Sequence, residues 1–229
     1  MKKATTDMSA RFIEHPSNPT LTARFIELSK YENYIGVNEY LIPDTQRDAI
    51  NLKTAKSEAH NHCKNTSCTM ALNWIGLHFG KDYPVLESLS TMNEFQYNAI
   101  LDVFMKPGER IQDWGPHVKC FNALFKNANL PIKACFGKYR ANEGRILDSL
   151  ENGFPVVLGT LITKDGHVVL FYRLVENEIT VSDNYAIIDS YGEAPKYKNT
   201  AADYYMITPK EFDRYVNETC HAIWLEETK

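Results

Sequence analysis

The chain has 229 residues, of which 44% are hydrophobic and 12% aromatic, and its Lys+Arg count of 25 against an Asp+Glu count of 29 gives a net charge of -4. This length and composition are typical of a folded globular protein with one sizeable core. The weakly acidic balance, without a long basic run, argues against nucleic acid or an anionic membrane surface as the partner.

The N-terminus begins with Met1-Lys2-Lys3, which is typical of a signal peptide, but no apolar segment follows it. We therefore predict no secretory signal and no transmembrane helix, and we expect the protein in the cytoplasm at synthesis. Residues 1–44 are interpreted as an N-terminal extension and residues 45–229 as one domain. Within the extension, residues 34–37 have the composition of a strand.

Four helices are predicted after a polar loop. The strongest covers residues 64–79, where apolar side chains at helical spacing form one stripe and Gly80 supplies the end. The others cover residues 92–105, starting at Thr91 or Asn93, residues 116–127, with Pro116 in the first turn, and residues 143–151.

The pattern changes after Gly153 to short apolar runs that predict strands. These runs cover residues 155–160, 167–174, 179–181, 185–189 and 221–225. Helices followed by antiparallel strands predict an α+β fold, in which helices pack on one sheet.

The chain has five cysteines, and an odd count without a signal sequence predicts reduced thiols. Cys63 would open the helix of residues 64–79, where free backbone N–H groups and the helix dipole favour a thiolate. Cys68 lies further along the helix and lacks this benefit. Cys63 is therefore the candidate nucleophile, with an ordinary structural cysteine as the alternative.

Two later strands carry a candidate base and a candidate acid. His167 opens an apolar strand directly after Gly166 and could act as a general base, although a lone histidine is more often a surface residue. Asp189 ends the next apolar strand and could orient the imidazole, or it could simply begin a turn. Asp183 is the competing acid.

Gln46, in the loop before Cys63, completes the set. Acyl transfer requires hydrogen-bond donors for the developing oxyanion, and a side-chain amide together with the backbone N–H of the nucleophile supplies two. Taken alone, Gln46 would be read as an ordinary loop residue.

Four sequence features, taken in chain order, resemble the bacteriocin-processing-peptidase-like (double-glycine-peptidase-like) group of papain-fold cysteine peptidases. They are Gln46, the run Cys63-x-x-Thr66-Ser67-x-x-Met70-x-Leu72, Gly166-His167 and Ile188-Asp189. The resemblance covers about residues 45–192. It implies a papain-like fold in which Cys63 is the nucleophile, His167 the base, Asp189 the orienting acid and Gln46 an oxyanion donor. The residue after the cysteine, commonly Gly or Asn in that group, is Lys64 here.

The resemblance implies cleavage of an amide bond. With no ATP-binding cassette and no membrane span in the sequence, the free-standing phage or bacterial members are the nearer comparison, and some of these cut peptidoglycan. We therefore expect a peptide or peptidoglycan substrate and, as one hypothesis, an endopeptidase (lysin) that another route delivers to the wall. Two alternatives stay open: an intracellular peptidase or acyltransferase, and a binding protein that retains the fold without catalysis.

Two further patterns are weaker. His60, His62, Cys63 and Cys68 lie within nine residues and could suggest zinc, but the spacing is poor for one tetrahedral ion, so neither a metal nor another cofactor is predicted. Trp114 could line a cleft, although a buried tryptophan at the start of a helix explains the pattern better.

Overall fold

The computed structural model describes residues 34–36, 63–80, 82–176, 183–189 and 203–228. All of them fall within one of the two units into which the chain divides, the unit that spans Asn33–Lys229. No described helix is both long and apolar enough to cross a membrane.

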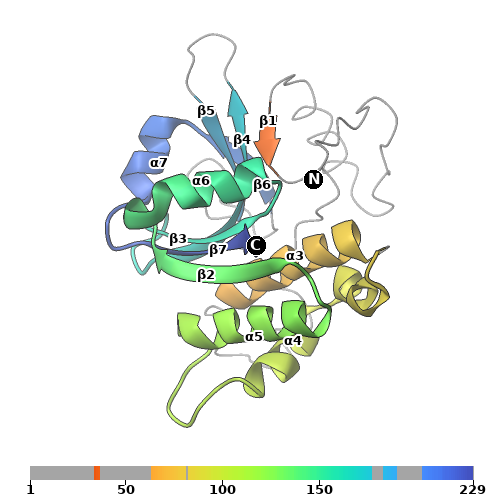
Figure 1. Cartoon of the computed structure of the whole chain (residues 1–229). Coiled ribbons are helices and arrows are strands. Elements are labelled where there is room, and N and C mark those ends of the chain that lie inside the picture. Colours follow the sequence, from red (N-terminus) through yellow and green to blue (C-terminus); the bar gives the residue numbers. More distant parts are fainter. Residues whose placement is uncertain (1–33, 37–62, 81, 177–182, 190–202, 229) are drawn as a thin grey trace. The chain divides into compact units, whose positions relative to one another are not determined.

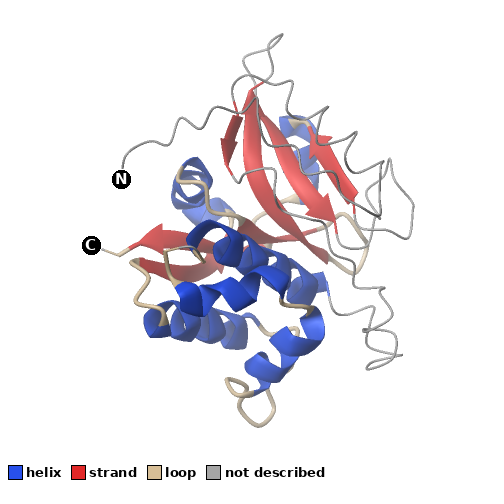
Figure 2. Cartoon of the chain, turned by 90° about the vertical axis from the view of Figure 1, so that its right-hand side faces the viewer, coloured by secondary structure: helices blue, strands red, loops and turns tan. Residues whose placement is uncertain are grey.

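The centre of this unit is an antiparallel sheet with the strand order β2-β7-β3-β4-β5-β6 (Figures 1 and 2). Strand β4 is the longest, so its first half pairs with β3 while its second half pairs with β1. The strands are β1 (Tyr34–Gly36), β2 (Ile132–Lys138), β3 (Val156–Thr160), β4 (His167–Glu176), β5 (Asp183–Asp189), β6 (Asp203–Ile207) and β7 (His221–Glu227).

Helices cover both faces of the sheet (Figure 1). On one face lie α3 (Cys63–Phe79), α4 (Glu94–Asp102) and α5 (Trp114–Asn127), and on the other lie α6 (Glu143–Glu151) and α7 (Pro209–Tyr215). Because side chains alternate along a strand, β3 contributes Val156 and Leu158 to the core under α6 and α7, where they pack with Ile146 and Phe212. The expected α+β class is therefore confirmed at the level of helices packed on an antiparallel sheet.

Most predicted elements occur within two or three residues of their expected bounds. Helix α4 begins after Asn93 rather than Thr91, because the Asn93 side chain accepts the Gln96 N–H while the Gln96 side chain accepts the Asn93 N–H. Residues 179–181, predicted as a strand, lie outside the described residues. The predictions missed β2, β6 and α7, and β2 separates α5 from α6, so the strict order of helices before strands was wrong.

The prediction of a single apolar stripe on α3 was also wrong. The helix is buried almost all round, and its buried side chains include polar ones at Asn65, Thr66, Ser67 and Thr69. A helix that is buried on every side belongs to the interior of a domain. Helix α3 therefore lies at the centre of the layer below the sheet, and its polar first turns require partners inside the protein.

The C-terminal end of α3 depends on close packing. The Gly80 N–H bonds to the Gly76 carbonyl at 2.8 Å, and Gly76 lies so close to the 3-10 helix η3 (Pro84–Thr91) that an added Cβ would be 2.3 Å from the backbone nitrogen of Ser90. Gly76 is therefore required for the approach of two backbones, and Gly80 does not adopt a left-handed conformation.

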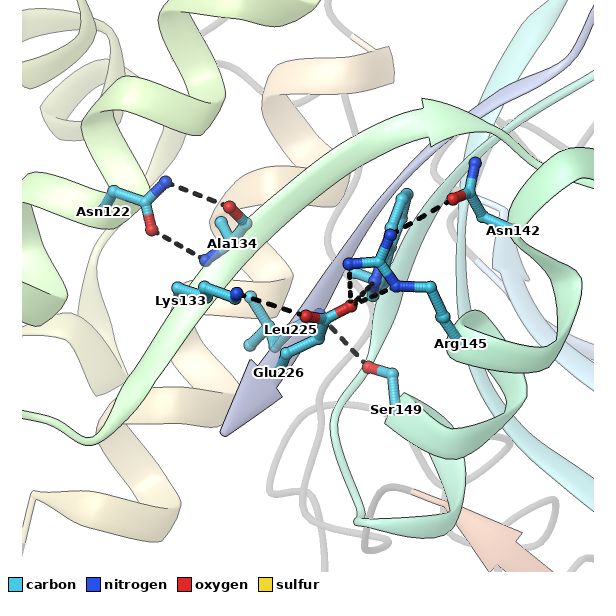
Figure 3. Close-up of polar contacts among 9 residues, drawn as sticks. Asn122, Lys133, Ala134, Asn142, Arg145, Ser149, Leu225 and Glu226 are labelled. Carbon is cyan, nitrogen blue, oxygen red and sulfur yellow. Dashed lines mark hydrogen bonds and ion pairs between the residues drawn. The ribbon is translucent and has the colours of Figure 1, made fainter. Parts of the chain in front are cut away.

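Side-chain contacts join strand β2 to α5 on one side and to β7 on the other (Figure 3). The Asn122 side chain of α5 donates to the Ala134 carbonyl at 3.0 Å and accepts its N–H at 2.8 Å. On β7, the Glu226 carboxylate accepts from Arg145 of α6 at 2.8 Å and pairs with Lys133 of β2 at 3.5 Å. The Asn122 side chain thus occupies the N–H and C=O of Ala134 on the edge strand, which would otherwise be free to pair with another strand.

Gly76→Ala should destabilise the fold by roughly 1–3 kcal/mol, because the η3 backbone must move to admit the methyl group. Gly144→Ala is the matched control, since a Cβ at this position of α6 meets nothing within 4 Å. We expect that control to leave stability unchanged or to raise it by up to about 1 kcal/mol. Urea unfolding measures both, and equal effects of the two substitutions would contradict the packing described here.

Candidate functional site

Cys63 is the first residue of α3 and is partly exposed. At this position the backbone N–H groups of the first turn have no partner within the helix, and the helix dipole places partial positive charge near the sulfur. The sulfur also accepts the backbone N–H of Val168 on β4. The predicted position of Cys63 at a helix start is thus confirmed, and the structure adds a direct contact with the sheet.

His167 is the first residue of β4, and its side chain shares a hydrogen bond with the Cys63 thiol. The residue is 7% exposed, so it is not the surface histidine that the alternative interpretation required. Its backbone carbonyl accepts the Thr160 hydroxyl at 3.0 Å, and Thr160 of β3 is also its partner in the sheet. The backbone of His167 is therefore held in two ways, by the hydrogen bond from the Thr160 hydroxyl and by pairing with β3.

The environment lowers the pKa of Cys63 below its ordinary value of 9.0. Burial acts in the opposite direction and raises the pKa, but the hydrogen bond and charge of His167, the N–H of Val168 and the charge of Lys64 together outweigh it. A lowered pKa increases the thiolate fraction at neutral pH, and the thiolate is the reactive form of a cysteine.

The other four cysteines have the opposite property. Burial raises the pKa of Cys68 and of Cys120 to about 12, and it also raises the pKa of Cys135 and of Cys220. Cys63 is the one cysteine of this chain whose thiol pKa is lowered. This contrast distinguishes Cys63 from Cys68: of the two, only Cys63 has an increased thiolate fraction at neutral pH.

The strand register distinguishes the two candidate acids. Strands β4 and β5 are antiparallel, with Leu170 opposite Ile188 and Glu176 opposite Asp183. The last residue of β5, Asp189, therefore lies at the same end of the strands as His167, the first residue of β4. Asp183 lies at the other end, nine residues along β4 from His167, which is about 30 Å. Asp183 also begins a strand and is not the hairpin turn that the sequence suggested.

Two parts of the predicted site lie outside the described residues. They are Gln46, the predicted oxyanion donor, and the two histidines of the zinc alternative, His60 and His62. Among the residues that the structure describes, no group of three or more His, Cys, Asp or Glu side chains is placed to hold a metal ion.

The sequence reasoning missed Lys64, which follows Cys63 in the first turn of α3. Its side chain is buried, and its ammonium donates to the Gln112 carbonyl and lies 3.9 Å from the centroid of the Trp114 ring. Burial lowers the pKa of Lys64 to about 8. The signal in the sequence from which a role for Lys64 could have been predicted was its position directly after a cysteine that opens a helix. Trp114, expected to be buried, is half-buried and stacks on Phe136 at 5.6 Å.

A buried polar network links α3, α4 and α5. His117 of α5 donates from Nε2 to the Ile111 carbonyl at 2.8 Å, so its Nδ1 accepts the Tyr97 hydroxyl at 2.6 Å. The Tyr97 oxygen in turn bonds to the thiol of Cys68. This series of hydrogen bonds satisfies buried polar groups of α3, α4 and α5.

Comparisons with protein-family models, with curated proteins and with solved structures find no match for this chain. The resemblance noted in the sequence therefore remains a hypothesis. What the structure defines is an α+β protein with a hydrogen-bonded Cys63–His167 pair, and functional inference must start from that pair.

The His117 network makes stability depend on pH. Burial lowers the pKa of His117 to about 4, below its ordinary value of 6.5, so the unfolded chain binds more protons between these two values. The free energy of unfolding should therefore fall by about 3 kcal/mol on acidification from pH 7 to pH 4. In urea titrations across this range, His117→Gln should remove that part of the slope.

Tyr97→Phe is the control for this prediction, because it deletes the hydrogen bonds of the Tyr97 hydroxyl to His117 and Cys68 but keeps the titrating imidazole. It should lower stability at every pH and retain the acid slope. An unchanged slope in His117→Gln would show that other groups control the acid sensitivity.

The register of β4 and β5 gives a second prediction. Asp189→Asn should slow alkylation of Cys63 at pH 6 several-fold, because an acid near His167 supports the charged imidazole. Asp183→Asn is the matched control at the far end of the same strand and should leave the rate unchanged. The reverse result, a loss confined to the Asp183 variant, would contradict the assignment of the acid.

Proposed function

We propose that this protein is a thiol hydrolase that cleaves an amide bond, with Cys63 as nucleophile and His167 as general acid and base. The observation that carries the proposal is the hydrogen bond between a buried histidine and a helix-terminal cysteine of lowered pKa. A structural cysteine has no need of a depressed pKa, since burial alone raises it, as at the other four positions.

The reaction follows from this pair. The Cys63 thiolate attacks the carbonyl carbon, and a tetrahedral oxyanion forms next to the backbone N–H of Cys63. The His167 imidazolium gives its proton to the leaving amine as the C–N bond breaks, which leaves a thioester on the sulfur. Water then attacks the thioester while His167 takes its proton, and the acid product and the free thiol are released.

Asp189 and Gln46 complete the proposed machinery. Asp189 would hold the second ring nitrogen of His167, a role that the register of β4 and β5 supports at the level of the backbone. Gln46 would donate its side-chain amide to the oxyanion, and this role rests on the sequence resemblance alone.

The arrangement of elements supports a papain-like fold for this domain. A helix that carries the cysteine at its N-terminus packs on an antiparallel sheet, and the histidine begins a strand of that sheet. The substrate class that we propose is a peptide, with peptidoglycan cross-links as the first natural substrate to test.

The proposal is tested by iodoacetamide labelling of the full chain between pH 4 and pH 9, with the labelled cysteine located by mass spectrometry. In the wild-type protein, Cys63 should react fastest, with a midpoint below the ordinary thiol value of 9.0 and below those of the other cysteines. His167→Ala should slow labelling of Cys63 about tenfold or more at pH 6, because the imidazolium no longer supports the thiolate.

Cys68→Ala is the control and should leave the profile unchanged, since the Cys68 thiol is buried and protonated. Slow labelling of Cys63 that is indifferent to His167 would leave a binding protein instead of an enzyme. If the pair is reactive, release of amines from purified peptidoglycan or from synthetic peptides, lost in Cys63→Ala, separates the two substrate classes.

A further inference from the structure

Lys64 is a buried cation to which the proposed reaction gives no role. It is the second residue of α3 and is 5% exposed. It lies four positions, about one helical turn, before the buried Cys68. Removing an ammonium group from water is unfavourable unless an anion or several hydrogen bonds compensate for the loss.

The contacts of Lys64 compensate only in part. Its ammonium donates to one carbonyl, that of Gln112, and faces the ring of Trp114 with 3.9 Å between nitrogen and centroid. Both partners offer partial negative charge but no formal charge. In the described part of the chain, no Asp or Glu carboxylate forms an ion pair with this ammonium.

The backbone around Lys64 adds to the excess of positive charge. Lys64 lies in the first turn of α3, and its partners Gln112 and Trp114 lie at the start of α5. The N-terminus of a helix carries partial positive charge, which disfavours a nearby cation. A buried ammonium therefore lies between two helix starts, and its charge acts on the Cys63 thiol.

The titratable groups that interact with Lys64 are Cys63, Cys68, Asp113 and His117. Cys68, with its pKa raised to about 12, and His117, with its pKa lowered to about 4, are both neutral at pH 7. The Asp113 carboxylate accepts the backbone N–H of Arg110 at 2.8 Å, and its charge acts on Lys64 without a direct ion pair. Cys63 remains as the group in which a full negative charge appears during the reaction.

We propose that Lys64 is a positioning residue, a cation anchored by Gln112 and Trp114 that stabilises negative charge on and beside the Cys63 sulfur. This inference rests on the proposed function, because it assigns Lys64 to the same nucleophile. His167 supplies the proton, and Lys64 supplies a fixed charge that stays when that proton leaves. The anions stabilised are the thiolate before attack and the oxyanion after it.

The test is the pH profile of Cys63 alkylation by iodoacetamide in Lys64→Met. Methionine keeps the length and volume of the lysine stem and removes the charge. We expect the midpoint to rise by about one pH unit, which is about tenfold slower labelling at pH 6. Lys64→Arg should restore the wild-type midpoint, whereas a purely structural role would not depend on charge.

The controls separate this inference from the proposed function. Lys126→Met removes the same charge from an exposed site at the far end of α5 and should leave the midpoint unchanged. A wild-type midpoint that is not below the ordinary thiol value of 9.0 and is indifferent to His167→Ala would overturn the proposed function. A low wild-type midpoint that rises in His167→Ala but not in a folded Lys64→Met would overturn the role of Lys64 alone.

Folding of each variant is checked by circular dichroism. If Lys64→Met does not fold, the same profile is measured on Lys64→Gln and on Trp114→Leu, which keeps the lysine but removes the ring beneath it. A raised midpoint in either supports the proposal, and unchanged midpoints in both overturn it.

Discussion

The contact between the start of α3 and the start of β4 is the constraint on which the site depends. Val168 makes this contact twice, since its N–H bonds to the Cys63 sulfur and its carbonyl accepts the Ser67 hydroxyl at 3.3 Å. Both bonds join the first turns of the helix to the residue directly after His167. The relative position of Cys63 and His167 is therefore set by backbone groups of a sheet strand, and not by flexible side chains alone.

A helix that brings its N-terminus to the centre of a domain must satisfy polar groups in the interior. Helix α3 does so with the Thr66 hydroxyl, which donates to the Glu94 carboxylate at 2.8 Å, and with the Asn65 side-chain amide, which donates one hydrogen bond to Asn98 on α4. The exposed fraction of Asn65, Thr66 and Glu94 is 0%. Such networks contribute little net stability, but they specify one orientation of the helix, because any rotation would leave a buried polar group without its partner.

Much of this arrangement could be predicted from local sequence. The helix of α3, the strand that opens at His167 and the capping residue Asn93 each have a local signal, and the structure confirms them within a few residues. Strand β2 could not be predicted in this way, because Ile132–Lys138 alternates weakly and acquires its structure from pairing with β7. The same limit applied to the two acids, since only the register of β5 separates Asp189 from Asp183.

Lys64 was missed for a related reason. A lysine in a sequence predicts a solvated side chain, and nothing local indicates that the start of α5 will close over it. The burial depends on Trp114, which packs beside Gly159 of β3, where a Cβ would lie 3.3 Å from the tryptophan ring. Gly159 is paired with Val168, the residue that contacts Cys63. The same pair of strands thus carries His167 and, through Trp114, contacts the residue that covers the Lys64 ammonium, so the electrostatics around Cys63 are a property of the sheet as much as of the helix.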